Sequence, residues 1–124
     1  MTAQPSTSRK GAAGEAQAAE FLESRGWSVI ERNFRCHAGE IDLIARREDV
    51  VAFVEVKAWR SVPPEDLSLS IGPRKRARIA RAASLFLVRR PELRLMHARF
   101  DVVFLGGEGG IRHIPGAFTG EGID

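Results

Sequence analysis

The stretch GEIDLIARREDVVAFVEVKAWR, residues 39–60, decides how we expect this chain to fold. It contains two short apolar runs, Glu40–Arg46 and Val50–Lys57, which are rich in Ile, Val, Leu and Phe and are joined by a charged turn. Short runs of this composition favour strands over helices, and the brief connection predicts an antiparallel hairpin. If the turn is centred between Glu48 and Asp49, Leu43 faces Val54 and Ile44 faces Phe53.

Three charged residues interrupt these apolar runs: Asp42, Glu55 and Lys57. In the same register Asp42 faces Glu55, and Lys57 lies on the face of Glu55, two residues further on. Directly opposed residues have Cβ atoms about 5 Å apart, and two like charges at that distance destabilise the pair. Divalent cations such as Mg²⁺ (or Mn²⁺) bind oxygen ligands and would relieve the repulsion. The hairpin therefore predicts a metal site held by Asp42 and Glu55.

The same three residues also resemble a known catalytic motif. Asp42 followed by Glu55-Val56-Lys57 resembles the PD-(D/E)xK motif of restriction-endonuclease-like phosphodiesterases, with Ile41 in place of the proline. The wider pattern of Gly-x-x-Gly-Glu, Asn-Phe-Arg, Gly-Glu-Ile-Asp-Leu-Ile-Ala, Phe-Val-Glu-Val-Lys and Arg-Phe-Asp-Val-Val is similar to the YraN family of small bacterial proteins. This resemblance spans residues 11–118 and implies a nuclease-like protein related to archaeal Holliday-junction resolvases. The implied fold is α/β, with a restriction-endonuclease-like core in which a mixed central sheet is flanked by helices.

The resemblance implies a catalytic set of Glu15, Asp42, Glu55 and Lys57. Asp42 and Glu55 would hold the metal, and Lys57 would orient the attacking water or stabilise the charged transition state. Glu15 lies on the apolar side of a helix expected over residues 11–25, where an acid can also cap free backbone amides. Its position alone favours capping, whereas the matching helical glutamate of the family favours a functional role.

A second helix is expected from Pro73 to about Arg90, because Pro suits the first turn and a further Pro follows. Basic residues crowd this span, and no acidic residue offsets them. Such a run is usually a solvated face, but one so one-sided favours contact with a phosphate backbone. The candidate nucleic-acid-binding residues are Arg60, Arg74, Lys75, Arg78 and Arg81.

The connection before this helix, residues 58–71, shows little periodicity. Trp59 could stack on a base, although most tryptophans in such places pack against the fold. In the family an arginine follows the lysine directly, whereas Ala58 and Trp59 separate Arg60 from Lys57 here. A phosphate contact for Arg60 is therefore an extrapolation from the family.

The rest of the chain predicts a strand at 27–34, a strand at 99–105 and a short strand at 111–114 that pairs with it. Asp101 is expected to pair with an arginine such as Arg99 rather than to act in catalysis. Residues 1–10 and 119–124 are expected to be tails around one nuclease-like domain at 11–118.

Bulk properties limit the function classes. The 124 residues carry a net charge of +3, which suits a polyanionic partner without proving one. A single cysteine, Cys36, excludes an internal disulfide, and the three scattered histidines lack the spacing of a zinc site. No apolar run reaches transmembrane length and no signal peptide is evident, so we expect a cytoplasmic protein without a membrane partner.

The preferred reading is a Mg²⁺-dependent endonuclease that acts on nucleic acid, DNA before RNA, and on branched or structured DNA in particular. The main alternative is a non-catalytic nucleic-acid-binding module that keeps the nuclease fold. A third is a structural interaction protein whose hairpin acids pair with its own arginines. The sequence leaves a homodimer open.

Overall fold

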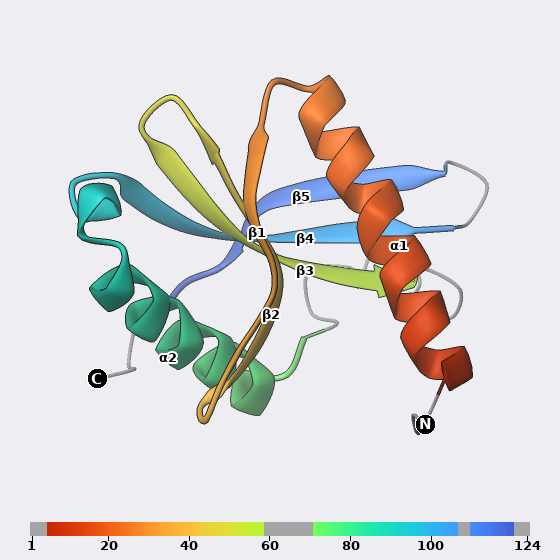
Figure 1. The fold of residues 1–124 in the computed structure, drawn as a ribbon, viewed down its shortest axis with the longest axis horizontal. Coiled ribbons are helices and arrows are strands. Elements are labelled where there is room, and N and C mark those ends of the chain that lie inside the picture. Colours follow the sequence, from red (N-terminus) through yellow and green to blue (C-terminus); the bar gives the residue numbers. More distant parts are fainter. Residues whose placement is uncertain (1–4, 59–70, 107–109, 121–124) are drawn as a thin grey trace.

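The computed structural model describes residues 5–58, 71–106 and 110–120, and of residues 5–12 it describes the backbone. One helix, three strands, a second helix and two strands follow one another, as the sequence predicts (Figure 1). In order, the elements are α1 (Pro5–Ser24), β1 (Ser28–Cys36), β2 (Gly39–Arg47), β3 (Val50–Ala58), α2 (Pro73–Arg89), a 3₁₀ turn η2 (Pro91–Leu93), β4 (His97–Leu105) and β5 (Ile111–Phe118).

The strands form one five-stranded mixed sheet in the order β1-β2-β3-β4-β5. Strands β3 and β4 are parallel, and the other neighbours are antiparallel. A parallel pair needs a long crossover connection, which the segment containing α2 provides. The expected α/β class and mixed sheet are confirmed.

The predicted hairpin register is also confirmed. Leu43 pairs with Val54 and Ile44 pairs with Phe53 across β2 and β3. A slip of one residue would turn each side chain to the other face of the sheet, so this register decides where the hairpin acids lie.

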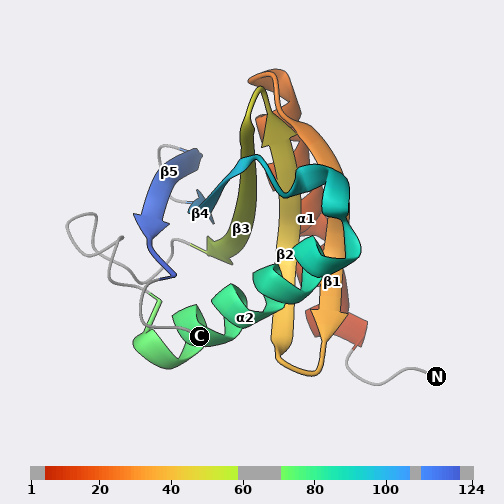
Figure 2. The ribbon, with the colours of Figure 1, turned by 90° about the vertical axis from the view of Figure 1, so that its left-hand side faces the viewer.

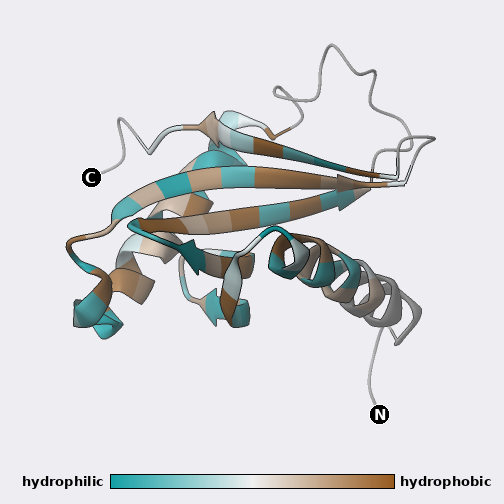
Figure 3. Cartoon of the chain, turned by 90° about the horizontal axis from the view of Figure 1, so that it is seen from above, coloured by the Kyte–Doolittle hydropathy of each residue, from teal (hydrophilic) through white to brown (hydrophobic). Residues whose placement is uncertain are grey.

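Each face of the sheet is covered by one helix, which gives three layers. Leu43 and Val54 pack toward α1 in one apolar cluster, whereas Ile44 and Phe53 pack toward α2 in another. Figure 2 shows α2 crossing in front of β1 and β2, with α1 behind them. In Figure 3 the long central strands are largely hydrophobic in colour, while the helices alternate between hydrophobic and hydrophilic residues.

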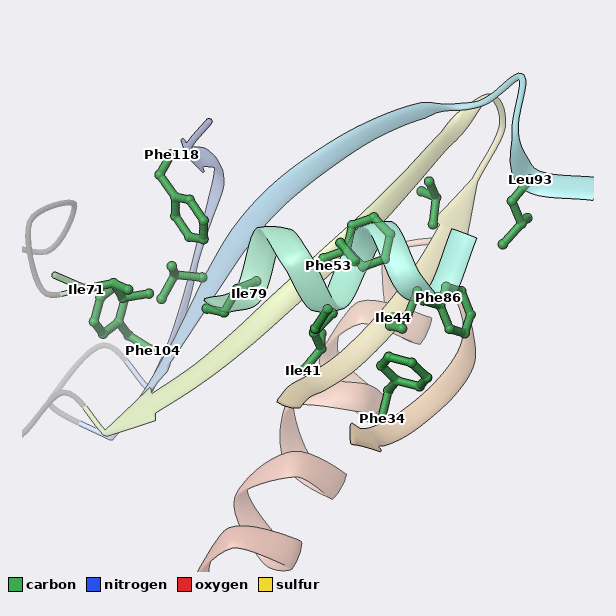
Figure 4. Packing of buried hydrophobic residues seen from close by; sticks show 14 residues of the cluster. Phe34, Ile41, Ile44, Phe53, Ile71, Ile79, Phe86, Leu93, Phe104 and Phe118 are labelled. Carbon is green, nitrogen blue, oxygen red and sulfur yellow. The ribbon is translucent and has the colours of Figure 1, made fainter. Parts of the chain in front are cut away.

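The apolar cluster between α2 and the sheet contains several aromatic side chains. Phe86 of α2 lies edge-on to Phe34 of β1 and to Phe53 of β3, with ring centroids 5.2 and 6.2 Å apart. Figure 4 shows these side chains converging between α2 and the sheet. On α2, the residues Ile79, Ala82, Ala83 and Phe86 are buried against the sheet.

Helix α1 begins at Pro5, whereas the sequence predicts a start at Gly11. The side chains of Ala18, Ala19 and Leu22 on this helix are buried. The helix ends at a left-handed Gly26 (φ 93°), where the N–H of Trp27 donates to the carbonyl of Leu22 at 3.1 Å. No helix in the described part of the chain is both long and apolar enough to cross a membrane.

Helix α2 lies close to the turn between β1 and β2. Gly39 in this turn has φ 155°, and a Cβ there would lie 3.2 Å from the Cβ of Arg78. Both the backbone conformation and the close approach of α2 therefore favour glycine. This contact brings the basic residues of α2 next to the start of β2, where Asp42 lies.

Candidate active site

Asp42 of β2 and Glu55 of β3, here called the acid pair, lie where the hairpin strands stop pairing. The regular pairing ends at Leu43 and Val54, and the next position brings Asp42 opposite Glu55. There the backbone N–H of Val56 donates to Asp42 Oδ2 at 2.8 Å. The side-chain carboxylate thus takes the place that a backbone carbonyl would have in a regular strand pair. The two carboxyl groups are close enough for each to affect the pKa of the other.

Glu55 is the more buried member of the pair, with 6% of its surface exposed. Burial and the neighbouring charge of Asp42 raise its pKa to about 7, although the nearby Lys75 opposes this. Burial also raises the pKa of Asp42, against the Val56 N–H and Lys75, which favour its charged form. The pair therefore tends to keep a shared proton up to near neutral pH.

Lys75 of α2 supplies the cation that the acid pair contacts. Its Nζ lies 2.5 Å from Glu55 Oε2, and its side chain is half-exposed. The sequence placed Lys75 among the nucleic-acid-binding residues and missed this contact. Nothing in the local pattern distinguishes Lys75 from its basic neighbours, because the contact depends on how α2 is rotated against the sheet.

Strand alternation places Lys57 on the same face as Glu55. Val54 and Val56 belong with the α1 cluster, so the residues between and after them point to the α2 side. Lys57 is half-buried, and its backbone is in register with Phe104 of the parallel strand β4.

Glu15 of α1 approaches the acid pair from the other layer. It is partly buried and accepts a hydrogen bond from the Asn33 side chain. Burial raises its pKa, and the charges of Asp42 and Glu40 raise it further. Asn33 itself adopts a left-handed conformation (φ 55°) inside β1, which asparagine tolerates better than most residues. Sequence reasoning did not find Asn33.

A cleft of about 490 Å³ lies beside the acid pair, between α2 and the β1–β2 turn. Arg35, Lys75 and Arg78 give it positive charge, and Glu40 is its acidic member. Arg35 contacts Glu40 at 3.2 Å, with both side chains largely exposed. Arg74 and Arg81 are also exposed on α2. Trp59 and Arg60 lie outside the described residues.

Asp101 is fully buried and forms a separate cluster with partly exposed partners. Arg99 donates to both its carboxylate oxygens at 2.9 Å, His113 Nε2 lies 2.8 Å from Oδ2, and the N–H of Gly116 donates to Oδ1 at 2.9 Å. Burial opposes its ionisation, but these hydrogen bonds hold the pKa of Asp101 below its ordinary value. The expected structural pairing with Arg99 is confirmed. The contact of His113 with Asp101 was not predicted from the sequence.

The donor set at the acid pair suits a hard cation. In the described part of the chain no group of three or more His, Cys, Asp and Glu residues could enclose a metal ion. Mg²⁺, however, is commonly held by one or two carboxylates together with water and substrate phosphates. Asp42 and Glu55 supply two such carboxyl groups side by side, and the ammonium of Lys75 already contacts Glu55.

Comparison with known proteins places the chain in a family. The model of the uncharacterised protein family UPF0102 matches residues 14–105, which include the acid pair. A UPF0102 protein of Rhodopseudomonas palustris is 43% identical over 110 residues, covering 89% of this chain and 83% of the relative. One from Azorhizobium caulinodans is 45% identical (91% and 85%), and one from Treponema pallidum is 44% identical (87% and 90%). These matches confirm the YraN-like part of the resemblance, and the chain belongs to the uncharacterised protein family UPF0102.

Proposed function

We propose that this protein is a Mg²⁺-dependent endonuclease with a restriction-endonuclease-like core, acting on phosphodiester bonds of structured or branched DNA. The acid pair is the observation that carries the proposal. If stability were the only requirement, we would expect a buried carboxylate to be surrounded by hydrogen-bond donors, as Asp101 is. Glu55 contacts one donor, Lys75, but it also lies against a second carboxyl, at a cost in stability that a bound cation would offset.

Asp42 and Glu55 are the residues that would hold Mg²⁺. When bound, the metal supplies Lewis-acid polarisation of the scissile phosphate and lowers the pKa of the attacking water. Lys57, on the same strand face as Glu55, stabilises negative charge that develops on the phosphate or orients the water. Glu15, whose pKa is raised in part by the charge of Asp42, would complete the site from α1.

The basic face of α2 supports a nucleic-acid substrate. Arg74, Arg78 and Arg81 are exposed, and Arg78 also lines the cleft beside the acid pair. Arginines on one helix face can follow a phosphate backbone without reading bases, so we expect selection by shape of the substrate rather than by its sequence.

The test is cleavage by the purified protein of labelled branched, nicked, single-stranded and duplex DNA, with matching RNA, in Mg²⁺ or Mn²⁺ and in chelator. We expect metal-dependent cleavage of branched DNA by the parent and none by Asp42→Asn. Tight binding without cleavage of any substrate would contradict the proposal and favour the non-catalytic binding module.

A further inference from the structure

Lys75 belongs to two features at once. Its ammonium contacts Glu55 of the acid pair, and its side chain lines the cleft that also contains Arg35 and Arg78. The side chain of Lys75 is 49% exposed, whereas that of Glu55 is 7% exposed. The cation of this ion pair is therefore free to reorient, and the carboxylate is fixed.

The position of Lys75 is unfavourable for the helix itself. Lys75 lies in the first turn of α2, which contains no acidic residue and no side-chain N-cap. The positive end of the helix dipole favours anions there and disfavours cations. The helix itself therefore gains nothing from a lysine at this point, and the contact that the structure gives Lys75 is with Glu55.

An ammonium is a weak substitute for a divalent cation at such a site. It brings one charge, while the acid pair can offer two carboxylates. Mg²⁺ or Mn²⁺ bound by the pair would bind the Glu55 carboxylate that Lys75 now contacts. The cation and Lys75 therefore compete for one carboxylate.

The cleft gives the displaced ammonium a place to go. Lys75 already lines this space, and the acidic Glu40 is among the other lining residues. Moving the ammonium there requires rotation about side-chain bonds of a half-exposed lysine and no change in the backbone.

We propose that Lys75 is an exchangeable counter-ion of the acid pair: it neutralises Glu55 in the metal-free protein and leaves it for the cleft when a divalent cation binds. This inference rests on the metal site of the proposed function. Lys75 is thus a positioning residue that keeps the two carboxyls together until the metal arrives.

The test compares Lys75→Met with Arg74→Met, which removes the same charge from the neighbouring, exposed position. Mn²⁺ binding is measured by titration calorimetry without nucleic acid. We expect Lys75→Met to bind Mn²⁺ about tenfold more tightly than the parent, the effect of removing a competing charged contact of ordinary strength. Arg74→Met should change the affinity by less than about threefold, since exposed charges are screened. Lys75→Arg should restore an affinity near that of the parent.

Thermal unfolding gives a second readout. In chelator Lys75→Met should melt below the parent, because the acid pair has lost its counter-ion. In saturating Mn²⁺ this difference should disappear or reverse, since the metal binds the folded variant more tightly. A lysine with only a structural role would lower the melting temperature equally in both conditions. If Lys75→Met does not fold, Lys75→Gln keeps a polar side chain at this half-exposed position and replaces it.

The outcomes separate this inference from the proposed function. Unchanged or weaker Mn²⁺ binding by Lys75→Met, with clear binding by the parent, overturns the exchange and leaves the nuclease proposal standing. Absence of Mn²⁺ binding by the parent and by all variants overturns both.

Discussion

The carboxylate of Asp42 accepts a 2.8 Å hydrogen bond from the backbone N–H of Val56, one residue beyond Glu55 on the neighbouring strand. Asp42 therefore has two roles that can be separated. Its oxygen completes the hydrogen bonding of the hairpin, while its negative charge is the part suited to a cation.

Two substitutions at Asp42 should separate these roles. Asp42→Asn keeps an oxygen acceptor for Val56 and removes the charge, so the metal-free fold should be as stable as the parent or slightly more so. Asp42→Ala leaves the Val56 N–H without its acceptor and should cost about 1–2 kcal/mol. Urea unfolding in chelator measures both. Mg²⁺ or Mn²⁺ should raise the melting temperature of the parent but of neither variant. Equal destabilisation by Asn and Ala would show that the charge itself holds the fold.

Glu55 should make the metal-free protein less stable as pH rises. Its pKa is raised from an ordinary value of 4.5 to about 7, so between these values the folded state keeps a proton that the unfolded state releases. The free energy of unfolding should therefore fall from about pH 4.5 to about pH 7 and then level off, by on the order of 1–3 kcal/mol.

Glu55→Gln removes this proton linkage. The variant should match the parent near pH 5, exceed its stability above pH 7, and show a flatter profile between them. Unfolding by urea across pH 5–8, in chelator, measures the difference. Parallel profiles for parent and variant would mean that Glu55 ionises normally in the folded state.

The acid pair could be predicted from sequence because its geometry follows from strand alternation and a short turn. Both apolar runs flank Glu48 and Asp49, so one register buries Ile44 and Phe53 together and brings Asp42 to Glu55. These are local constraints, and a hairpin satisfies them without information from distant parts of the chain.

The partners of the buried and half-buried acids could not be predicted, because they come from other elements of the fold. The contact of Lys75 depends on the rotation of α2 and on its approach to the turn at Gly39. The left-handed Asn33 has no signal in a strand-like sequence, and His113 reaches Asp101 only once β5 pairs with β4. Side-chain chemistry identified candidate residues, but packing between layers decides which of them meet.

Asp101 should make the protein more stable as pH rises, whereas Glu55 should make it less stable. The pKa of Asp101 lies below the ordinary value, so it contributes stability above about pH 4, and this contribution is lost as pH falls through its folded-state pKa. Asp101→Asn leaves Arg99 and His113 without their carboxylate and should cost about 3 kcal/mol at pH 7. Asp49→Asn is the matched control, since its contact with His97 is long (3.8 Å) and exposed. Equal effects of the two substitutions in chemical unfolding would contradict the structural role of Asp101.

Lys57 should matter for cleavage far more than for binding. Its position beside Glu55 on the strand face suits the transition state rather than the ground-state complex. Lys57→Ala should reduce cleavage of branched DNA to background in Mg²⁺ while its dissociation constant for the same DNA changes by less than about tenfold. Filter or fluorescence binding in chelator and a cleavage time course measure the two. Loss of binding in proportion to activity would make Lys57 a substrate contact instead.

The basic face of α2 should matter for binding of DNA far more than for its cleavage. Arg74, Arg78 and Arg81 are exposed and follow one another at helical spacing, so each can contact one phosphate but none is placed to read a base edge. Replacing all three by alanine should weaken binding of every DNA sequence alike and lower the slope of log affinity against log salt by about one unit per lost contact. Arg94→Ala, which removes an exposed charge beyond the end of α2, should change the slope little. Because the variant keeps Glu15, the acid pair and Lys57, its cleavage at saturating DNA should stay near that of the parent. A triple variant with unchanged affinity and slope would show that these arginines form only a solvated face and that nucleic acid, if bound, approaches the acid pair from elsewhere.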